Sequence, residues 1–325
     1  MEQEYNYIPL SEPIPITDQV WTEGTLPLVC TSTLAYNHEP YIRECLDGIL
    51  MQKTTFPVQV LVHEDCSTDR TAEILKEYQA KYPNLIKVFY EPENVYSLKD
   101  PEEKRKRLNK FYDWRIGKYI ALCEGDDYWI DPLKLQKQVD FLEANKDFSA
   151  CVHQTKVEYQ NKYKSSHIFF DFKKNIVELN DLIGPRVCHT ASLLAKNDVF
   201  KNNNLPFVLS GDRLIFLMLI SIGKIRYINE CMAIYRKNSS SLSHSVSINQ
   251  MKQDLNMIPF LVKIIPSFPK YRYLSFLYYT IAFYSINISI NNKLKYALLS
   301  VFYSFSFFPG NIIYIYDKIT KGKIR

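Results

Sequence analysis

Three carboxylates, those of Glu124, Asp126 and Asp127, lie within four consecutive positions of the chain. The apolar run 119–122 directly precedes them and reads as a short buried strand, so the acids stand where a strand ends and a loop begins. Open α/β sheets bind their ligands at this place. Carboxylates this close repel one another, so at neutral pH they need a cation between them or raised pKa values. A divalent cation with oxygen ligands meets this need and keeps positions for waters or substrate phosphates. We therefore expect a metal and diphosphate site here, in preference to a solvated acidic turn.

The segments around these acids alternate between strand-like and helix-like patterns, which predicts a parallel sheet with right-handed crossovers. The polar pairs Tyr36-Asn37 and Glu64-Asp65 follow the first two strands, so they should reach the same edge of the sheet as Asp126. The strands expected from the pattern are 26–33, 58–62, 86–90 and 119–122, and the helices are 42–50, 71–82 and 131–142.

Capping residues indicate where these helices begin. Pro40 suits the first helical position, as does Pro132 after Asp131. Asp69 suits the N-cap of the helix that starts near residue 71. The charged segment 91–107 is expected to be a loop that passes into a helix. Further along, the sequence predicts strands at 148–159, 190–194 and 232–236 and a buried helix at 214–222.

The charge of the chain is unevenly distributed over three expected parts. Residues 1–25 form an irregular lead-in, residues 26–250 an α/β domain, and residues 251–325 a helical tail. The formal net charge is +5 in total. The tail holds ten Lys and Arg against two Asp, which is +8, so the rest of the chain carries −3. The basic excess therefore concerns the partner of the tail.

Composition excludes several classes of protein. The chain has only 9 Gly and lacks both common glycine-rich phosphate-binding motifs. Its 7 cysteines are scattered and never spaced as C-x-x-C, which argues against a disulfide framework or a zinc site and fits a reducing cytoplasm. The amino terminus is polar and acidic, so we expect no signal peptide. No nucleic-acid partner is expected.

Short motifs recur in order between about residues 26 and 243. They are Tyr36-Asn37, Glu64 to Asp69, Asn94-Val95, Asn109, Glu124-Gly125-Asp126, Gly211-Asp212 and Tyr235-Arg236. By the order and spacing of these stretches, the chain resembles a bacterial family 2 glycosyltransferase of the kind that builds surface polysaccharides. In that family the corresponding motifs are, in the same order, P-T-Y-N, D-D-G-S-T-D, N-V-G, R-N-x-G, D-x-D, the catalytic acid and Y-R.

The chain also departs from the family patterns at several positions. Glu64 and Cys66 replace the first Asp and the Gly of D-D-G-S-T-D. Leu108 replaces the Arg of R-N-x-G, although Arg107 is adjacent. Asn238 stands where a His often follows the Y-R motif.

The resemblance implies a GT-A fold, an α/β architecture with a mostly parallel central sheet flanked by helices, here with a C-terminal helical extension. It implies transfer of a sugar from a nucleotide-sugar donor, UDP-sugar favoured, to a saccharide hydroxyl. Asp212 would be the catalytic base of an inverting displacement, and Asp126 and Asp127 would bind Mn²⁺ or Mg²⁺. The residues expected to bind the donor nucleotide are Tyr36, Asn37, Glu64, Asp65, Asn109 and Glu124, and those near the acceptor or phosphate are His189, Ser192 and Arg236.

Simpler interpretations remain open at the level of sequence. Asp65 could be a turn acid, His189 a structural histidine, Asp212 a helix cap and Arg236 part of a surface salt bridge. A nucleotidyltransferase would need a loop rich in Gly, Arg and Lys after the first strand, and residues 31–38 contain none. A non-catalytic sugar-binding relative would be expected to lack Asp126 or Asp212.

The tail combines aromatic and apolar stretches with Lys and Arg. Residues 274–290 lack charge but are interrupted by polar residues, which suits a spanning helix poorly. Residues 296–308 are aromatic and apolar, and four cations follow Pro309-Gly310. Such segments suit helices that lie on an anionic membrane. We expect a cytoplasmic enzyme, peripheral on the inner membrane face, with a polyprenyl-diphosphate-linked acceptor. The alternative is a helical cap that packs on the domain or on a second subunit.

Overall fold

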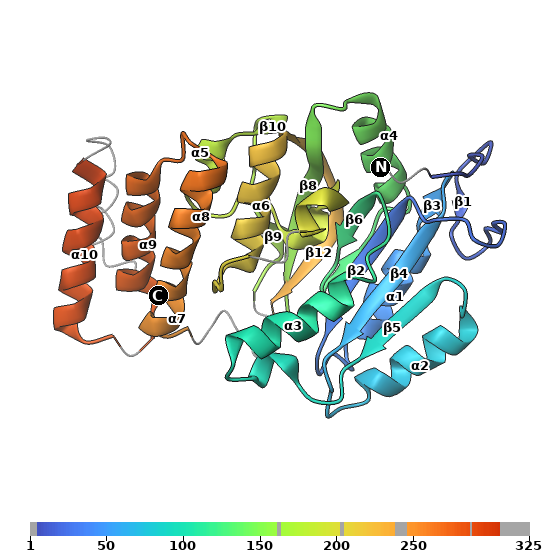
Figure 1. Cartoon of the computed structure of the whole chain (residues 1–325), viewed down its shortest axis with the longest axis horizontal. Coiled ribbons are helices and arrows are strands. Elements are labelled where there is room, and N and C mark those ends of the chain that lie inside the picture. The colour runs from blue at the N-terminus through green and yellow to red at the C-terminus, as the bar shows by residue number, and fades with distance from the viewer. Residues whose placement is uncertain (1–4, 161–163, 202–204, 238–245, 287, 306–325) are drawn as a thin grey trace. The chain divides into compact units, whose positions relative to one another are not determined.

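The computed structural model describes residues 5–160, 164–201, 205–237, 246–286 and 288–305 (Figure 1). The chain divides into two compact units, which we describe separately. The first, the sheet unit, holds residues 1–177, 187–203 and 222–238. The second, the helical unit, holds residues 178–186, 204–221 and 239–325. The sequence analysis expected a domain boundary at residue 250, between the α/β domain and the tail. That boundary was drawn from the extent of the family resemblance and not between compact units, so it stays a prediction.

Four parallel strands form one half of the large sheet. They lie in the order β6, β2, β4, β5, so the parallel sheet expected from the alternating pattern is confirmed. Thr31, in the middle of β2, is paired with Val60 on one side and Ala121 on the other. Their bounds are β2 Val29–Ala35, β4 Val58–Glu64, β5 Ile86–Tyr90 and β6 Tyr119–Leu122.

The other half of the sheet is mixed. The strand β11 (Leu194–Lys196) runs antiparallel between β6 and β8 (Phe148–Tyr159), and β8 is parallel to β12 (Lys224–Lys237). The two-residue strand β7 (Tyr128–Trp129), directly after the acids, pairs antiparallel with β12. The short strands β9 (His167–Ile168) and β10 (Ile176–Val177) flank β8 and β12, and β1 (Ile14–Pro15) pairs with β3 (Lys53–Thr54).

The strand predicted at 190–194 is wrong in its first part. Residues Thr190–Ser192 form a 3₁₀ turn, η2, and β11 begins only at Leu194. The cause lies in His189, whose Nδ1 accepts a hydrogen bond from Ala191 N and whose carbonyl accepts one from Ser192 Oγ. Polar side chains bonded to the local backbone thus replace the ladder bonds of a strand.

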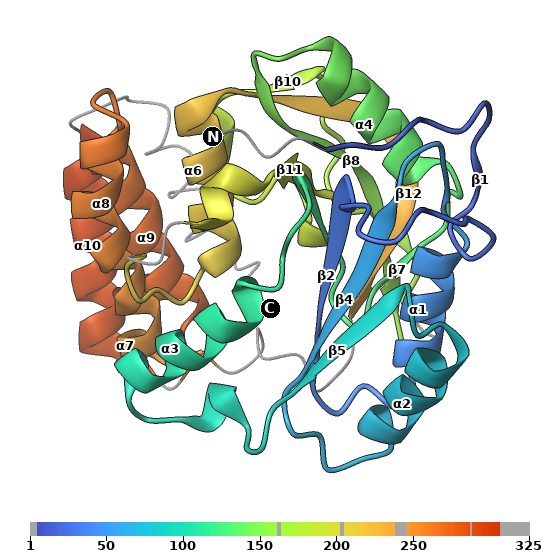
Figure 2. The same cartoon turned by 45° about the vertical axis from the view of Figure 1, so that its right-hand side comes forward.

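Three helices, α1, α2 and α3, cover the parallel half of the sheet, and α4 packs against β8 and β11 of the mixed half. Figure 2 shows α1 and α2 on one face and α3 on the other. Pro40 lies in the turn before α1 rather than in its first position, and Asp69 Oδ1 accepts from Thr71 N at 2.9 Å, one residue before the N-cap position. The segment expected as a loop becomes helical at Pro101, after the N-cap Asp100. The bounds are α1 Ile42–Leu50, α2 Thr71–Lys81, α3 Pro101–Tyr112 and α4 Lys134–Ala144.

The helical unit contains the predicted C-terminal helical extension. The helices α9 and α10 lie side by side, and Ser275 and Ser300 each donate a hydrogen bond to the other's carbonyl at 2.9 Å. Among the residues that the structure describes, no helix is long and apolar enough to cross a membrane. The bounds are α5 Leu179–Leu182, α6 Gly211–Ile222, α7 Ile248–Lys252, α8 Met257–Ile264, α9 Lys270–Tyr284 and α10 Ile290–Phe305.

The loop after β4 contains a residue that favours glycine. Cys66 has a φ of 57°, in the left-handed region, where a β-carbon costs about 1–2 kcal/mol. Cys66→Gly should therefore be more stable than Cys66→Ala by about 1 kcal/mol, since both variants lose the sulfur and only glycine removes the strain. Urea unfolding measures the difference. The control is Ala80→Gly on α2, where the glycine variant should be less stable than the wild type by a similar amount. Equal stability of the two Cys66 variants would contradict the assignment of strain.

Candidate active site

The acidic loop lies against the end of β2. Cys123 N donates to Ser32 O at 3.3 Å and Gly125 N donates to Leu34 O at 3.0 Å. A β-carbon on Gly125 would lie 2.5 Å from His38 Nδ1 and 3.0 Å from Leu34 O. The central residue of Glu124-Gly125-Asp126 is therefore glycine because the loop after β2 leaves no room for a side chain. This contact confirms that the acids and the first polar loop meet at one edge of the sheet.

The loops after β2 and β4 are joined by hydrogen bonds between motif residues. Asn37 N donates to Ser67 Oγ at 3.0 Å, and Asn37 Oδ1 accepts from Thr68 N at 2.8 Å. Glu39 N donates to Asp69 Oδ2 at 3.0 Å. The expected convergence of three loops is thus confirmed, and part of the motif holds the loops together.

Glu64 and Asp65 are buried and serve the backbone of these loops. Glu64 Oε1 accepts from Ser67 N at 2.8 Å. Asp65 accepts from Val95 N at 2.6 Å and from Tyr96 N at 3.3 Å. Burial raises the pKa of Asp65 above its ordinary value, although these two N–H groups oppose the shift. A contact of either carboxylate with a nucleotide stays a prediction.

Asp127 is the deepest of the three acids and is 1% exposed. Its Oδ1 accepts from Arg236 N at 2.9 Å, while its Oδ2 lies 3.6 Å from His189 Nδ1 and has no hydrogen-bond partner among the described residues. Burial, followed by the charges of Asp126 and Cys123, raises the pKa of Asp127 well above its usual value. Burial beside other acids therefore disfavours the charged form of Asp127, and a nearby cation would favour it.

Arg236 ties the acidic loop to α1. Its Nη1 donates to Asp126 O at 3.3 Å, its Nη2 pairs with Glu44, and its guanidinium lies 4.4 Å from the centre of the Tyr128 ring. Arg236 thus forms the salt bridge that the sequence analysis gave as its alternative role, and its partner is Glu44 on α1. Burial lowers the pKa of Arg236. A contact with diphosphate stays a prediction.

His189 and Ser192 are buried beside this cluster. The His189 ring stacks on the Tyr235 ring with centroids 4.1 Å apart. Ser192 Oγ donates to His189 O at 2.6 Å, so its hydroxyl serves the η2 turn. Their expected place near the acceptor stays a prediction.

The donor set of the acidic loop fits a hard divalent cation. Asp126 is half-buried, and the Oδ2 of Asp127 is a buried oxygen without a hydrogen-bond partner among the described residues. Within the described ranges, no group of three His, Cys, Asp or Glu side chains could hold a metal. Mg²⁺ and similar ions are commonly held by one or two carboxylates together with substrate phosphates and waters. Asp126 and Asp127 therefore fit a cation that binds with a diphosphate.

One wall of the site escaped the sequence analysis. It consists of aromatic and cationic side chains from α3 and the turns beside it: Tyr96, Lys104, Tyr112 and Arg115. Lys104 Nζ lies 4.5 Å from the centre of the Tyr96 ring, and Arg115 Cζ lies 4.1 Å from that of Tyr112. Burial lowers the pKa of Lys104, and Asp65 opposes the shift. Tyr96 stands at the position of the Gly of N-V-G, whereas Lys104, Tyr112 and Arg115 lie in no family motif named above. Tyr36 is exposed, and Asn109 is half-buried on α3.

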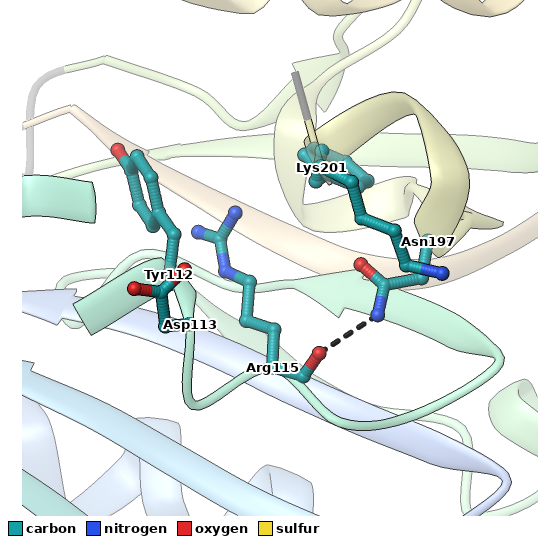
Figure 3. A pocket seen from close by; sticks show the side chains of 6 residues that line it. Tyr112, Asp113, Arg115, Asn197 and Lys201 are labelled. Carbon is teal, nitrogen blue, oxygen red and sulfur yellow. Dashed lines mark hydrogen bonds between the residues drawn. The ribbon is translucent and has the colours of Figure 1, made fainter. Parts of the chain in front are cut away.

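A cavity of about 180 Å³ adjoins this wall (Figure 3). The Arg115 guanidinium points into it between Tyr112 and the segment that carries Asn197 and Lys201. Asn197 Nδ2 donates to Arg115 O at 2.7 Å and so fixes the backbone on which Arg115 stands. The lining residues are Tyr112, Asp113, Arg115, Asn197, Phe200 and Lys201.

Asp212 belongs to the helical unit and lies in the first turn of α6. Its Oδ1 accepts from Arg213 N at 2.8 Å, and its Oδ2 pairs with Arg186. Arg213 in turn donates to the carbonyls of Leu182 and Gly184, so the turn that bears Arg186 is held in place. The Asp212 side chain keeps 20% of its surface exposed, which leaves it accessible.

Asp212 has an electrostatic environment opposite to that of Asp127. Burial alone would raise its pKa, but the charge and hydrogen bond of Arg186, with the Arg213 N–H, hold the pKa below its ordinary value. Asp212 is therefore ionised at neutral pH and able to accept a proton. Arg186 was missed by the sequence analysis because it lies 26 residues before Asp212.

Removal of Arg186 should reverse this shift. In Arg186→Met, burial is no longer opposed by that charge, so the pKa of Asp212 should rise, whereas Arg186→Lys should keep most of the depression. Because the folded-state pKa is lowered, Asp212 stabilises the fold above the unfolded-state pKa, and this stabilisation is lost as pH falls through the folded-state value. ¹³C NMR of the aspartate carboxyls measures the titration. An unchanged Asp212 pKa in Arg186→Met would contradict the assigned cause.

The family profile described as "Glycosyl transferase family 2" matches residues 33–201. An uncharacterized protein of Mycobacterium tuberculosis is 32% identical over 223 residues, which are 68% of this chain and 62% of that protein. The chain thus spans under two thirds of that relative's length. The UDP-Glc:alpha-D-GlcNAc-diphosphoundecaprenol beta-1,3-glucosyltransferase WfaP of Escherichia coli is 25% identical over 232 residues, covering 70% of this chain and 83% of WfaP.

Two solved structures share the fold at low sequence identity. TarS 1–349 of S. aureus in complex with UDP-GlcNAc has a TM-score of 0.53 and 18% identity, covering 87% of this chain and 74% of that one. A mannosyltransferase of Pyrobaculum calidifontis in complex with GDP-Man and Mn²⁺ has a TM-score of 0.50 and 15% identity, covering 97% of this chain and 87% of that one. The fold is therefore the mixed, mostly parallel GT-A sheet with flanking helices.

Proposed function

The chain belongs to glycosyl transferase family 2, and from this premise we propose that it is an inverting, metal-dependent enzyme that uses a UDP-sugar. The single observation that carries the proposal is the meeting of three strand-end loops around Glu124, Asp126 and Asp127, joined by the hydrogen bonds described above. The UDP-GlcNAc bound to TarS and the UDP-Glc named for WfaP support the choice of nucleotide. The product would be a saccharide for the cell surface.

The donor would lie at this edge of the sheet. Asp126 would hold the cation, with Asp127 in the same site and Glu124 toward the ribose. When bound, Mn²⁺ or Mg²⁺ stabilises the charge that develops on the leaving diphosphate. Tyr36 would cover the base, and Asp65, Asn37, Glu64 and Asn109 would frame the nucleoside.

The proposed reaction needs one base. Asp212 would take the proton of the acceptor hydroxyl as that oxygen bonds to the anomeric carbon and the bond from this carbon to the diphosphate breaks. A direct displacement with one base inverts the anomeric configuration. The lowered pKa of Asp212 supports this role, because a base must be ionised before it can act.

Donor turnover tests the reaction. With Mn²⁺, the wild type should slowly hydrolyse one sugar nucleotide of a UDP-, GDP- and dTDP-sugar panel, and EDTA should abolish the turnover. Asp126→Ala should lose binding of the nucleoside diphosphate in calorimetry with Mn²⁺. Asp212→Asn should lower turnover about 10²-fold or more, because it keeps the shape of the side chain but removes the base.

Asp140→Asn, an exposed acid on α4, is the matched control and should keep both binding and turnover. Nucleotide affinity should also stay unchanged in Asp212→Asn, which separates a base from a binding residue. Full turnover in EDTA would contradict the proposed metal dependence. Normal turnover of Asp212→Asn would mean that Asp212 acts only as a helix cap.

A row of exposed apolar side chains on α10 supports a place at the membrane. Ile290, Leu294, Leu298 and Phe302 follow one another at intervals of four residues and are 77%, 59%, 69% and 66% exposed. Residues four apart lie on the same side of a helix. Part of the expected stretch 296–308, and all four cations after it, lie outside the described residues. By sequence, the tail of residues 251–325 carries a formal net charge of +8. An apolar helix face beside excess positive charge suits an anionic bilayer.

We propose that this face rests on the inner surface of the membrane, where a saccharide acceptor linked to a polyprenyl diphosphate would be found. The name of WfaP includes a diphosphoundecaprenol acceptor, which supports this choice. The competing occupants of the face are the rest of the chain and a second subunit.

Liposome flotation distinguishes these occupants. The full chain should float with anionic vesicles at low salt, and high salt should release part of it. Leu294→Glu with Leu298→Glu should abolish flotation. Asn291→Glu with Asn292→Glu adds the same charge to the same helix without touching the row, and should weaken flotation only slightly. Failure of the wild type to float at low salt, with a dimer in solution, would assign the row to a subunit contact.

A further inference from the structure

Asp254, in the tail, is a buried carboxylate that binds a distant part of the chain. It lies in the 3₁₀ helix η5 (Gln253–Asn256) and is 5% exposed. Its Oδ1 accepts hydrogen bonds from Leu209 N and Ser210 N, each at 2.9 Å, and its Oδ2 accepts one from Ser210 Oγ at 2.6 Å. Three hydrogen bonds that converge on one carboxylate hold the two residues that donate them.

The segment that Asp254 holds leads directly into α6, the helix that bears Asp212. Ser210 O accepts the hydrogen bond that starts this helix, from Leu214 N at 3.1 Å. The N–H, the hydroxyl and the carbonyl of Ser210 are therefore all engaged, the first two by Asp254. Asp212 follows two residues later in the same helical turn, so the place of its backbone depends on that of Ser210.

Other tail residues contact the chain on both sides of Asp212. Asn256 Nδ2 donates a hydrogen bond to Phe207 O at 2.9 Å. Arg213, directly after Asp212, has its guanidinium carbon 4.8 Å from the centre of the Phe276 ring on α9. Residues 204–221 and the tail also belong to one compact unit, the helical unit. The surroundings of Asp212 are thus built largely by the tail.

Asp254 is a costly residue to bury. Burial raises its pKa, although the hydrogen bonds from Ser210 and Leu209 and the charge of Arg213 oppose the shift. Among the described residues, no Lys or Arg forms a salt bridge with it. Replacement of a buried charge by an apolar side chain is often neutral or stabilising. What the carboxylate supplies is a fixed geometry for residues 209–210.

We propose that Asp254 is a positioning residue that sets the place of Asp212, so that the C-terminal tail forms part of the catalytic apparatus. This inference rests on the proposed role of Asp212 as the base. A displacement of a reacting group by about 1 Å can lower a rate about 10²-fold. Donor binding should be independent of Asp254, because the loops expected to bind the donor belong to the sheet unit.

Two substitutions at Asp254 test the proposal. Asp254→Ala removes all three hydrogen bonds, so it should lower donor turnover with Mn²⁺ about 10-fold or more and leave the Kd of UDP unchanged. Asp254→Asn should restore most of the turnover. Its amide oxygen can accept from the same two N–H groups, and its NH₂ group can donate to Ser210 Oγ.

The pKa of Asp212, measured by ¹³C NMR, gives a second readout that does not depend on turnover. In Asp254→Ala it should rise, because a displaced Asp212 pairs less well with Arg186. Loss of the negative charge at position 254 would by itself lower this pKa. A rise therefore reports displacement of Asp212 and not the missing charge.

Ser247→Ala is the matched control in the same tail. The Ser247 side chain caps α7 by accepting from Gln250 N. Its loss should lower the melting temperature, since a helix cap is removed, without changing turnover or the pKa of Asp212. This control separates lost stability from lost positioning.

A double mutant tests whether Asp254 acts through Asp212. In the Asp212→Asn background, Asp254→Ala should lower turnover no further, because the base is already absent. Additive losses would overturn the inference, as would wild-type turnover and an unchanged Asp212 pKa in Asp254→Ala. Should Asp254→Ala prove unfolded by thermal melting, Ser210→Ala and Asn256→Ala each remove one of the bonds, and wild-type turnover in both would overturn it.

The failure of this inference is distinguishable from that of the proposed function. Normal turnover of Asp212→Asn would remove the proposed base and with it the catalytic part of the inference. The titration would then still decide the structural part: a raised Asp212 pKa in Asp254→Ala supports the placement by the tail, and an unchanged one overturns it.

Discussion

The site depends on holding two adjacent carboxylates, Asp126 and Asp127, at the end of a buried strand. Their mutual repulsion and the loss of water around Asp127 both oppose this arrangement. Arg236 offsets these costs. Its backbone N–H donates a hydrogen bond to Asp127, and its guanidinium donates one to the Asp126 carbonyl and pairs with Glu44 on α1. The acidic loop is thus fixed from β12 and from α1 at once.

Close backbone approach provides the second support. A β-carbon on Gly48 of α1 would lie 2.7 Å from Trp129 O, so the helix touches the strand that leaves the acids. Trp129 is buried, donates its indole N–H to Ala191 O, and lies under the ammonium of Lys134 at 4.0 Å. Burial lowers the pKa of Lys134 to about 7. The bulky residues after the acids therefore anchor the loop.

Sequence reasoning succeeded where the determinant is local. Alternation of apolar residues predicted the strands and helices, and strand-end positions predicted that the loops at Asn37 and Asp65 would meet the acids. It failed where long side chains cross between elements. Arg115 precedes β6 but reaches Ser32 in β2, and Arg186 reaches Asp212 from another turn. It also missed that Glu64 and Asn37 bond to the loops themselves, since a motif records which residues occur and not which partner each one has.

The two key carboxylates show how one chain can prepare two roles at the same pH. Asp127 is buried beside other acids, so its pKa is raised and its charged form is disfavoured. Asp212 is paired with Arg186, so its pKa is lowered and its charge is permanent at neutral pH. Carboxylates whose environments push their pKa values apart are typical of catalytic sites. Because Asp212 already has Arg186 as its cation, it needs no metal to be ionised. The division of labour that we propose follows from the neighbours of each carboxylate: burial among other acids suits Asp127 to bind a cation with the donor, and the pairing with Arg186 suits Asp212 to take a proton.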